Sequence, residues 1–221
     1  DIVNTLYALK ARYQLFSNNY TGALAAANMV DLSKKSVFNF EAANPNPVFN
    51  AVTSTNNVYQ PVDSTLGLPA SVAPDLSDKR VPFYTTINAT INPRFRLNGF
   101  WNSATTAIPL YYPGEISLIK AEAYARQSTP DLVNGIVELN KVVTKKPAND
   151  ALGIGADLPP VAPVTAADLL LQIYRNRCIE LYLSGMKLED MRRFGRPTSE
   201  RKRTYDIIIA RIKFKDILFS G

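Results

Sequence analysis

The feature that most constrains the fold is a pair of similar segments separated by a long interruption. Residues 9–12, LKAR, align with residues 119–122, IKAE, and residues 20–28 align with residues 132–140. In both copies apolar residues recur at spacings of three and four, stop at a short polar stretch and then resume, which predicts two helices joined by a turn. The sequence therefore predicts two helical hairpins of the tetratricopeptide-repeat kind, with chance similarity between amphipathic hairpins as the alternative.

The first copy predicts a helix over residues 2–17 and a second helix over residues 20–32. Ala23 and Ala27 lie one turn apart in the second helix, and they are small enough to let the two helices pack closely. The large apolar residues of the first helix follow helical spacing and predict one buried face. These residues are Leu6, Leu9, Tyr13 and Phe16.

Between the copies, residues 36–110 contain eight prolines and many Asn and Thr, which predicts loops with short strands such as VPFYTTI at 81–87. A long irregular segment in a compact domain is commonly where ligands bind. A second proline-rich loop, residues 146–163, leads to a capping-box-like helix start at Thr165 and Asp168. We predict a mainly α fold and divide its single domain into a hairpin (1–35), the proline-rich loop region (36–110), a second hairpin (111–145), and a loop with C-terminal helices (146–221).

The chain has no histidine, which excludes Ser-His-Asp and Cys-His catalysis and the commonest zinc sites. Carboxylate pairs would then have to perform any acid–base chemistry, but the spacings of Glu115 with Glu122 and of Glu189 with Asp190 do not require it. The only cysteine, Cys178, lies in an amphipathic stretch and is expected to be buried. We predict no catalytic residue, no metal and no cofactor. The expected ion pairs are Glu122 with Arg126, and Glu189 with Arg192 or Arg193.

The formal net charge of +6 is unevenly placed along the chain. Residues 171–215 hold twelve Lys or Arg against five acids, whereas residues 36–110 hold four of each. A solvated helix face explains the basic stretch, because its apolar neighbours recur at helical spacing, and we expect no nucleic-acid partner. GIGADLPP at 153–160 contains no third glycine and is interpreted as a flexible loop instead of a phosphate site. No run of eighteen apolar residues occurs.

The neutral segment 36–110 is rich in aromatic and amide side chains. A sugar presents apolar C–H faces and rings of hydroxyls, so a site for it needs flat aromatic surfaces and hydrogen-bonding side chains. The alternative is that these aromatic residues only fix the loops to the helices. The residues expected to contact a ligand are Trp101, Tyr84, Arg94 and Asn98.

The stretch IYRNRCIELYLSGMKLEDMRRFGRP at 173–197 resembles a helix pattern of the SusD/RagB family of outer-membrane nutrient-binding lipoproteins. EISLIKAEAYAR at 115–126, followed by VELNKV at 137–142, is similar to the family's repeat helix and its partner. Asp78-Lys79-Arg80 resembles the Asp-Pro-Arg that precedes the family's central loops. Asn176 and Ser184 each stand where the family has Glu, which puts two helix-end ion pairs in question, and residues 204–221 do not match.

The resemblance implies a tetratricopeptide-repeat scaffold whose loops bind glycans without cleaving them. It implies a location on the extracellular face of the outer membrane, with an oligosaccharide ligand and a SusC-like TonB-dependent transporter as partners. It also implies a further N-terminal part with more repeats and a lipidated cysteine, which is not Cys178 and is the only membrane attachment expected. Two other hypotheses remain: a helical-repeat scaffold that binds a protein or peptide, and a glycoside hydrolase.

Overall fold

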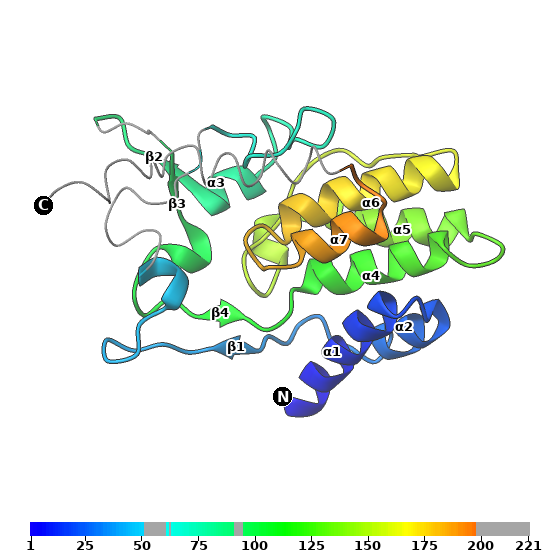
Figure 1. Cartoon of the computed structure of the whole chain (residues 1–221), viewed down its shortest axis with the longest axis horizontal. Coiled ribbons are helices and arrows are strands. Elements are labelled where there is room, and N and C mark those ends of the chain that lie inside the picture. Colours follow the sequence, from blue (N-terminus) through cyan, green and yellow to red (C-terminus); the bar gives the residue numbers. More distant parts are fainter. Residues whose placement is uncertain (51–60, 62, 91–94, 198–221) are drawn as a thin grey trace, which may run out of the picture.

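The computed structural model describes residues 1–50, 61, 63–90 and 95–197. These residues form a mainly helical fold with very short strands, as the sequence predicts (Figure 1). The helices are α1 (Ile2–Phe16), α2 (Tyr20–Ala27), α3 (Arg80–Tyr84), α4 (Pro113–Ala125), α5 (Leu132–Val143), α6 (Ala166–Glu180) and α7 (Lys187–Arg193). The strands are β1 (Val37–Phe38), β2 (Thr85–Ile87), β3 (Phe95–Leu97) and β4 (Ile108–Pro109), and short 3-10 helices cover Gly99–Trp101 and Pro147–Asn149.

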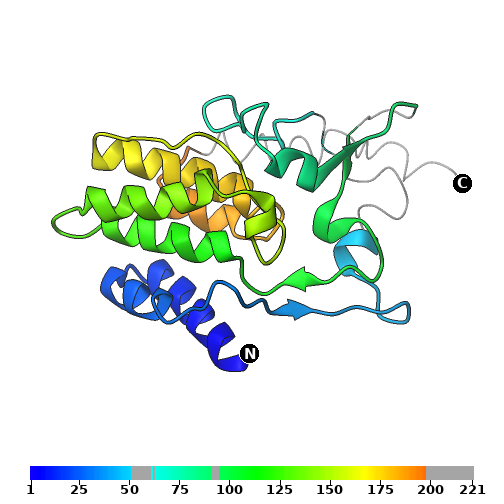
Figure 2. The same ribbon diagram turned by 180° about the vertical axis from the view of Figure 1, so that it is seen from behind.

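The helices stack as layers, with α1 and α2 on one side of α4 and α5, and with α6 and α7 on the other (Figures 1 and 2). The central helix α4 is buried on both faces. Ile116 and Ile119 pack with the first hairpin, whereas Leu118 and Ala121 pack with α5 and α6. α4 carries apolar residues on both of these sides, so either side would expose hydrophobic surface if it were left uncovered.

The first hairpin closes through small side chains. Alanines of α1 face alanines of α2, and the absence of bulk at these positions lets the backbones approach. The prediction that Leu6 and Tyr13 lie on the buried face of α1 is wrong: they are 59% and 64% exposed, and Leu9 and Phe16 are half-buried. The residues that α1 and α2 bury instead are Ala8, Ala11, Leu15, Ala23, Ala26 and Ala27.

The strands of the proline-rich loop region lie in the left half of Figure 1, whereas Val72 of the same region packs against α6, and the region is tied to itself by two short antiparallel strand pairs. β1 pairs with β4, and β2 pairs with β3. The predicted strand at 81–87 is only partly observed, because its first four residues belong to α3. The Asp78 carboxylate accepts a hydrogen bond from the backbone N–H of Arg80, which starts the helix, and Pro82 suits a first helical turn.

The predicted helix start before α6 is confirmed: the Thr165 hydroxyl accepts a hydrogen bond from the Asp168 backbone N–H at 3.1 Å. α6 ends at Glu180, before the predicted Ser184, and the chain then turns through Leu183 and Gly185, both at positive φ.

Among the described residues, none of the helices combines the length and apolar character needed to cross a membrane. The four-segment division of the chain stays a prediction.

Gly114, near the start of α4, lies directly against the side chain of Glu180 in α6. A Cβ atom placed there would overlap Oε1 of Glu180, which is completely buried. That same oxygen accepts a hydrogen bond from Lys145 at 2.8 Å, and Oε2 accepts one from Arg80 at 3.2 Å. Gly114 is therefore the position at which α4 leaves room for the carboxylate.

We expect Gly114→Ala to lower the free energy of unfolding by about 1–3 kcal/mol, because overpacking must displace a buried charged group. Urea unfolding followed by circular dichroism measures the change. Gly135→Ala in α5 is the matched control, since its added Cβ would come too close only to the side-chain tip of Leu169 and would meet no charged group. Equal effects of the two substitutions would contradict the assigned role of Gly114.

Candidate ligand-binding site

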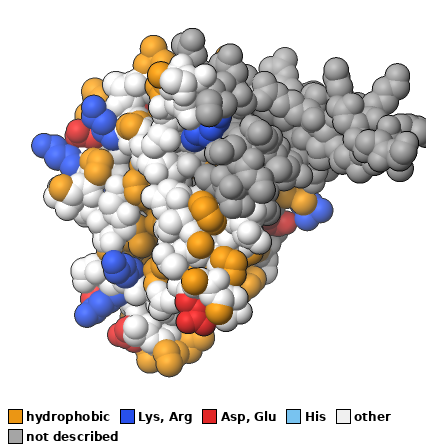
Figure 3. All heavy atoms as spheres, turned by 90° about the vertical axis from the view of Figure 1, so that its left-hand side faces the viewer, with side chains coloured by type: hydrophobic (Ala, Val, Ile, Leu, Met, Phe, Trp, Pro, Cys, Tyr) orange, Lys and Arg blue, Asp and Glu red, His pale blue; other side chains and the backbone are white. Residues whose placement is uncertain are grey.

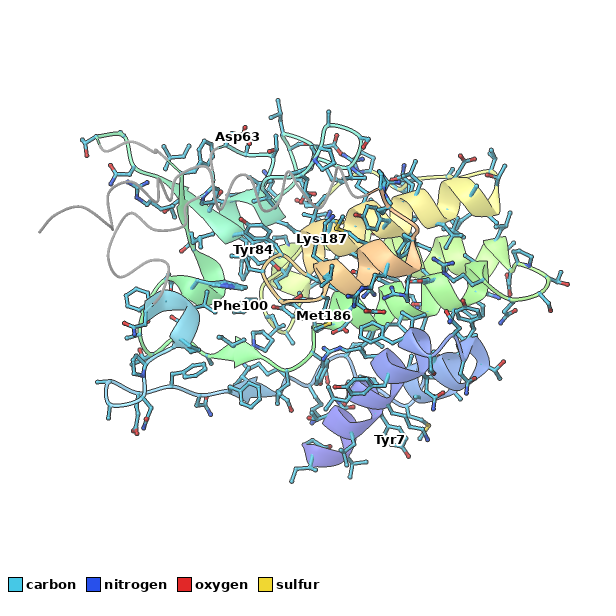
Figure 4. The ribbon with its side chains drawn as sticks, viewed as in Figure 1. Tyr7, Asp63, Tyr84, Phe100, Met186 and Lys187 are labelled. Carbon is cyan, nitrogen blue, oxygen red and sulfur yellow. The ribbon has the colours of Figure 1, made fainter. Side chains whose placement is uncertain are left out.

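The aromatic residues of the loop region form a cluster between that region and the C-terminal helices. Figure 4 shows Tyr84, Phe100 and Met186 in this space, and Trp101 packs with them. The ring centroids of Tyr84 and Trp101 lie 6.2 Å apart, and those of Phe100 and Trp101 lie 5.7 Å apart. Burial raises the pKa of the Tyr84 hydroxyl well above its usual value, and this hydroxyl donates to the Glu180 backbone carbonyl.

The structure places two of the four predicted contact residues inside this cluster, since Tyr84 is 1% exposed and Trp101 is 2% exposed. Their rings fix the loop region to the helices, and a sugar would reach them only if the cluster opened. Arg94 lies outside the described residues. Asn98 is half-buried, at the surface side of the cluster. Ligand contact by these four residues stays a prediction.

Asn98 begins a short row of amide and hydroxyl groups at the edge of the cluster. The Asn102 amide donates to Asn98 Oδ1 at 3.4 Å, and the Thr106 hydroxyl donates to Asn102 Oδ1 at 2.6 Å. Asn102 itself is exposed. Gly99 adopts a φ of +64° and lies against Phe83, which lets the chain turn so that the next two aromatic rings point inward.

Asn46 organises this loop end, although the sequence analysis did not single it out. It is completely buried, and its amide donates to the carbonyls of Phe100 and Thr106, both at 2.8 Å. Its side-chain oxygen accepts from the backbone N–H groups of Val48 and Phe49. The sequence signal for this role is the position of Asn46 between the two prolines of NPNP at 44–47. An Asn in such a turn commonly forms side-chain hydrogen bonds to the nearby backbone.

Arg80 joins the loop region to the helical layers. Its guanidinium is 1% exposed and forms ion pairs with Asp78 at 2.7 Å and with Glu180 at 3.2 Å. Burial alone would lower the pKa of Arg80, but the two carboxylates outweigh that effect and the pKa is raised. Asn176 is a third partner, whose side-chain oxygen accepts a hydrogen bond from Arg80 at 3.0 Å and so links α6 to Arg80 without a charge.

Each carboxylate that the sequence analysis considered for catalysis forms an ion pair with an arginine. Arg12 binds Glu115 through two nitrogens, at 2.6 and 2.7 Å. The predicted pairs of Glu122 with Arg126, at 2.9 Å, and of Glu189 with Arg192, at 3.3 Å, are confirmed. Arg193 also binds Glu122, which shows that part of the basic C-terminal stretch is structural and not a solvated face. Asp190, the neighbour of Glu189 in sequence, contacts Arg177 at 2.9 Å.

Cys178 is buried, as expected for a small apolar residue. Burial raises the pKa of its thiol, and the ammonium group of Lys187, 2.8 Å from Sγ, partly opposes this increase. The thiol is therefore less ionised at neutral pH than an exposed cysteine, which disfavours nucleophilic chemistry. Within the described ranges, no three His, Cys, Asp or Glu side chains lie where they could share a metal ion.

Figure 3 views the loop end of the molecule directly. Hydrophobic and uncharged side chains make up most of the described surface there, and charged side chains lie mainly toward the edges. This agrees with the charge balance of residues 36–110 in the sequence. The described residues of this face therefore present mainly apolar and uncharged polar groups.

Comparison of the sequence with protein-family models and with curated proteins finds no match. The structure is similar to a SusD superfamily protein from Parabacteroides distasonis ATCC 8503, with 15% sequence identity, a TM-score of 0.59, and coverage of 84% of this chain and 50% of that chain. It is also similar to a SusD superfamily protein from Bacteroides vulgatus ATCC 8482, with 14% identity, a TM-score of 0.55, and coverage of 94% and 55%. The resemblance inferred from the sequence is thus confirmed at the level of the fold, and this chain spans about half the length of both proteins.

We expect Trp101→Ala to lower the free energy of unfolding by about 3–5 kcal/mol, because it removes a large ring from a packed interior. Urea unfolding measures the loss. Phe38→Ala is the control, since Phe38 is 56% exposed in β1 and its removal should cost less than about 1 kcal/mol. A Trp101→Ala protein as stable as the parent would show that the ring does not hold the loop region in place.

Proposed function

We propose that this chain is part of a cell-surface protein that binds an oligosaccharide without cleaving it and delivers it to a TonB-dependent, SusC-like outer-membrane transporter. The protein would be held at the extracellular face of the outer membrane by an N-terminal lipid anchor outside this chain. The observation that carries the proposal is the shared fold with two SusD superfamily proteins over most of this chain.

The character of the loop end supports a glycan ligand. Asn98 and Asn102 bring amide groups to the edge of an aromatic cluster, and hydroxyl groups of Ser103, Thr105 and Thr106 lie beside them. Amides and hydroxyls donate and accept at once, which matches the hydroxyl groups of a sugar. We propose this row of five side chains, the amide row, as part of the binding surface.

The environment of the carboxylates supports binding over hydrolysis. A glycosidase needs one carboxyl group that can give up a proton and a second that faces the sugar. Glu115, Glu122 and Glu180 are buried and bound to arginine or lysine, so none of them is available in that form. These ion pairs build the framework instead.

Isothermal titration of the intact protein against an oligosaccharide panel tests the proposal. We expect at least one glycan to bind, and the double substitution Asn98→Ala and Asn102→Ala to weaken that binding about tenfold, because two hydrogen-bonding groups are lost at about 0.5–1.5 kcal/mol each.

Asn28→Ala is the control, because Asn28 is exposed beyond α2 and lies among the helices. The absence of binding by any glycan in the panel would reject the proposal. Release of reducing sugar during incubation with polysaccharide would instead indicate a hydrolase.

A helical-repeat scaffold for a protein partner is the second candidate function, and α1 favours it. Ile2, Leu6 and Tyr13 lie on one face of this helix and are 79%, 59% and 64% exposed. Repeat arrays normally end in a polar outer face, so an apolar outer face is typical of a surface that contacts another protein segment.

The scaffold hypothesis predicts that charge on this face weakens protein binding and leaves glycan binding unchanged. With the purified SusC-like transporter as probe, Leu6→Lys combined with Tyr13→Lys should lower the affinity at least tenfold in surface plasmon resonance. Leu76→Lys is the matched control, because Leu76 is 95% exposed and lies outside the helices. Unchanged affinity in the α1 variant would remove α1 from the contact. Transporter binding through α1 together with no glycan response would favour the scaffold over the glycan-binding function.

A further inference from the structure

The sequence contains two Asn-Gly steps, Asn98-Gly99 at the edge of the aromatic cluster and Asn134-Gly135 in α5. Such a step can lose ammonia, because glycine has no side chain to hinder attack by its backbone nitrogen on the preceding Asn side chain. The attack requires a glycine N–H that is not already bonded and an Asn side chain that can turn toward it. The surroundings of the two steps therefore decide which of them reacts.

Hydrogen bonds restrain both reacting groups of Asn134-Gly135. The Gly135 N–H donates to the Asp131 carbonyl at 3.0 Å, within the first turn of α5. The Asn134 amide donates to the Asp131 carboxylate at 2.6 Å. Gly135 is also buried, with the side chain of Leu169 close to it. These contacts would have to break before the two groups could meet, so the structure protects this step.

Asn98-Gly99 has neither of these hydrogen bonds. Within the ranges that the structure describes, the Gly99 N–H and the Asn98 side-chain NH2 donate to no other group. Both residues are half-buried, Asn98 has an extended backbone, and Gly99 follows at a φ of +64°. The Asn102 amide donates to Asn98 Oδ1 at 3.4 Å, where it can stabilise the negative charge that develops on this oxygen during attack.

We propose that Asn98 is a site of spontaneous deamidation. The Gly99 nitrogen bonds to Cγ of Asn98 and gives up its proton, and the side-chain nitrogen leaves with that proton as ammonia, which closes an imide ring. Water then opens the ring at either carbonyl and leaves aspartate or isoaspartate at this position. In sum, one amide and one water become one carboxylate and one ammonium ion, so the reaction needs no enzyme, metal or oxidant.

Deamidation changes the loop end in two ways. A negative charge replaces the NH2 donor of Asn98 in a row of otherwise uncharged side chains, so a ligand hydroxyl loses a donor there. Isoaspartate also adds one carbon to the backbone, at the turn that directs the buried rings of Phe100 and Trp101 inward. The effect on ligand binding rests on the proposed glycan function, whereas the reaction and its effect on the turn do not.

The experiment ages the intact protein at neutral and at mildly alkaline pH and maps its peptides by mass spectrometry. We expect aspartate and isoaspartate to accumulate at Asn98 at least about tenfold faster than at Asn134, because the hydrogen bonds of Asn134-Gly135 must break first. The rate should rise in alkali, since the attacking nitrogen must lose its proton. Protein unfolded in guanidinium chloride is the control, because both steps should then react at similar rates.

Asn98→Gln keeps the amide but should stop the reaction, because its longer side chain closes a ring much more slowly. Trp101 is the only tryptophan of the chain, so its fluorescence reports on the turn. Its emission should change as the parent protein ages and stay constant in Asn98→Gln.

Asn98→Asp should bind the glycan about fivefold more weakly than the parent, through the lost donor. If the fresh parent binds no glycan, the glycan function fails, but the peptide maps still test the deamidation. The deamidation proposal is overturned if Asn98 keeps its amide in the folded protein, or if it reacts no faster than Asn134.

Discussion

The carboxylate of Glu180 lies at the end of α6 and is shared by three other parts of the chain. Arg80 brings the loop region to one oxygen, and Lys145 brings the segment after α5 to the other. Gly114 at the start of α4 leaves the space that the carboxylate fills. Burial alone would lower the pKa of Lys145, but Glu180 and Asp150 outweigh it and the pKa is raised, so the Lys145 ammonium stays charged at neutral pH and loses its proton only in strong alkali. Because a buried charge without its partner is costly, this one group fixes how the loop region meets the helices.

The helical layers and the loop region are stabilised by different interactions. The layers depend on apolar packing, with small residues in the first hairpin and a central α4 that is buried on both faces. The loop region has few regular backbone hydrogen bonds, and it is held by buried side chains that bond to backbone, above all Asn46, and by rings that pack on the helices. The helical layers thus form a rigid base, and side chains anchor the loop region to it. The polar groups of the amide row remain at the surface, where the proposed glycan binding places the ligand.

The amide row and the aromatic cluster behind it differ in exposure. Asn102 and Thr105 of the row are exposed, whereas the rings of Tyr84 and Trp101 are buried. A ligand would therefore meet amide and hydroxyl groups first, and an extended ligand would contact the row at several points.

Local periodicity and turn chemistry determined the helices, their approximate ends, the N-cap at Thr165 and the ion pair of Glu122 with Arg126, because these depend on residues within one or two turns of each other. Tertiary structure decided the rest. The face of α1 that is buried depends on which partner it meets, and α2 offers alanines, so Leu6 and Tyr13 remain outside. The same holds for Trp101, whose ring suits either a sugar or a core. The ring is buried in a cluster that includes Ile179 of α6, roughly eighty residues away in sequence, and contacts between such distant segments carry no local signal.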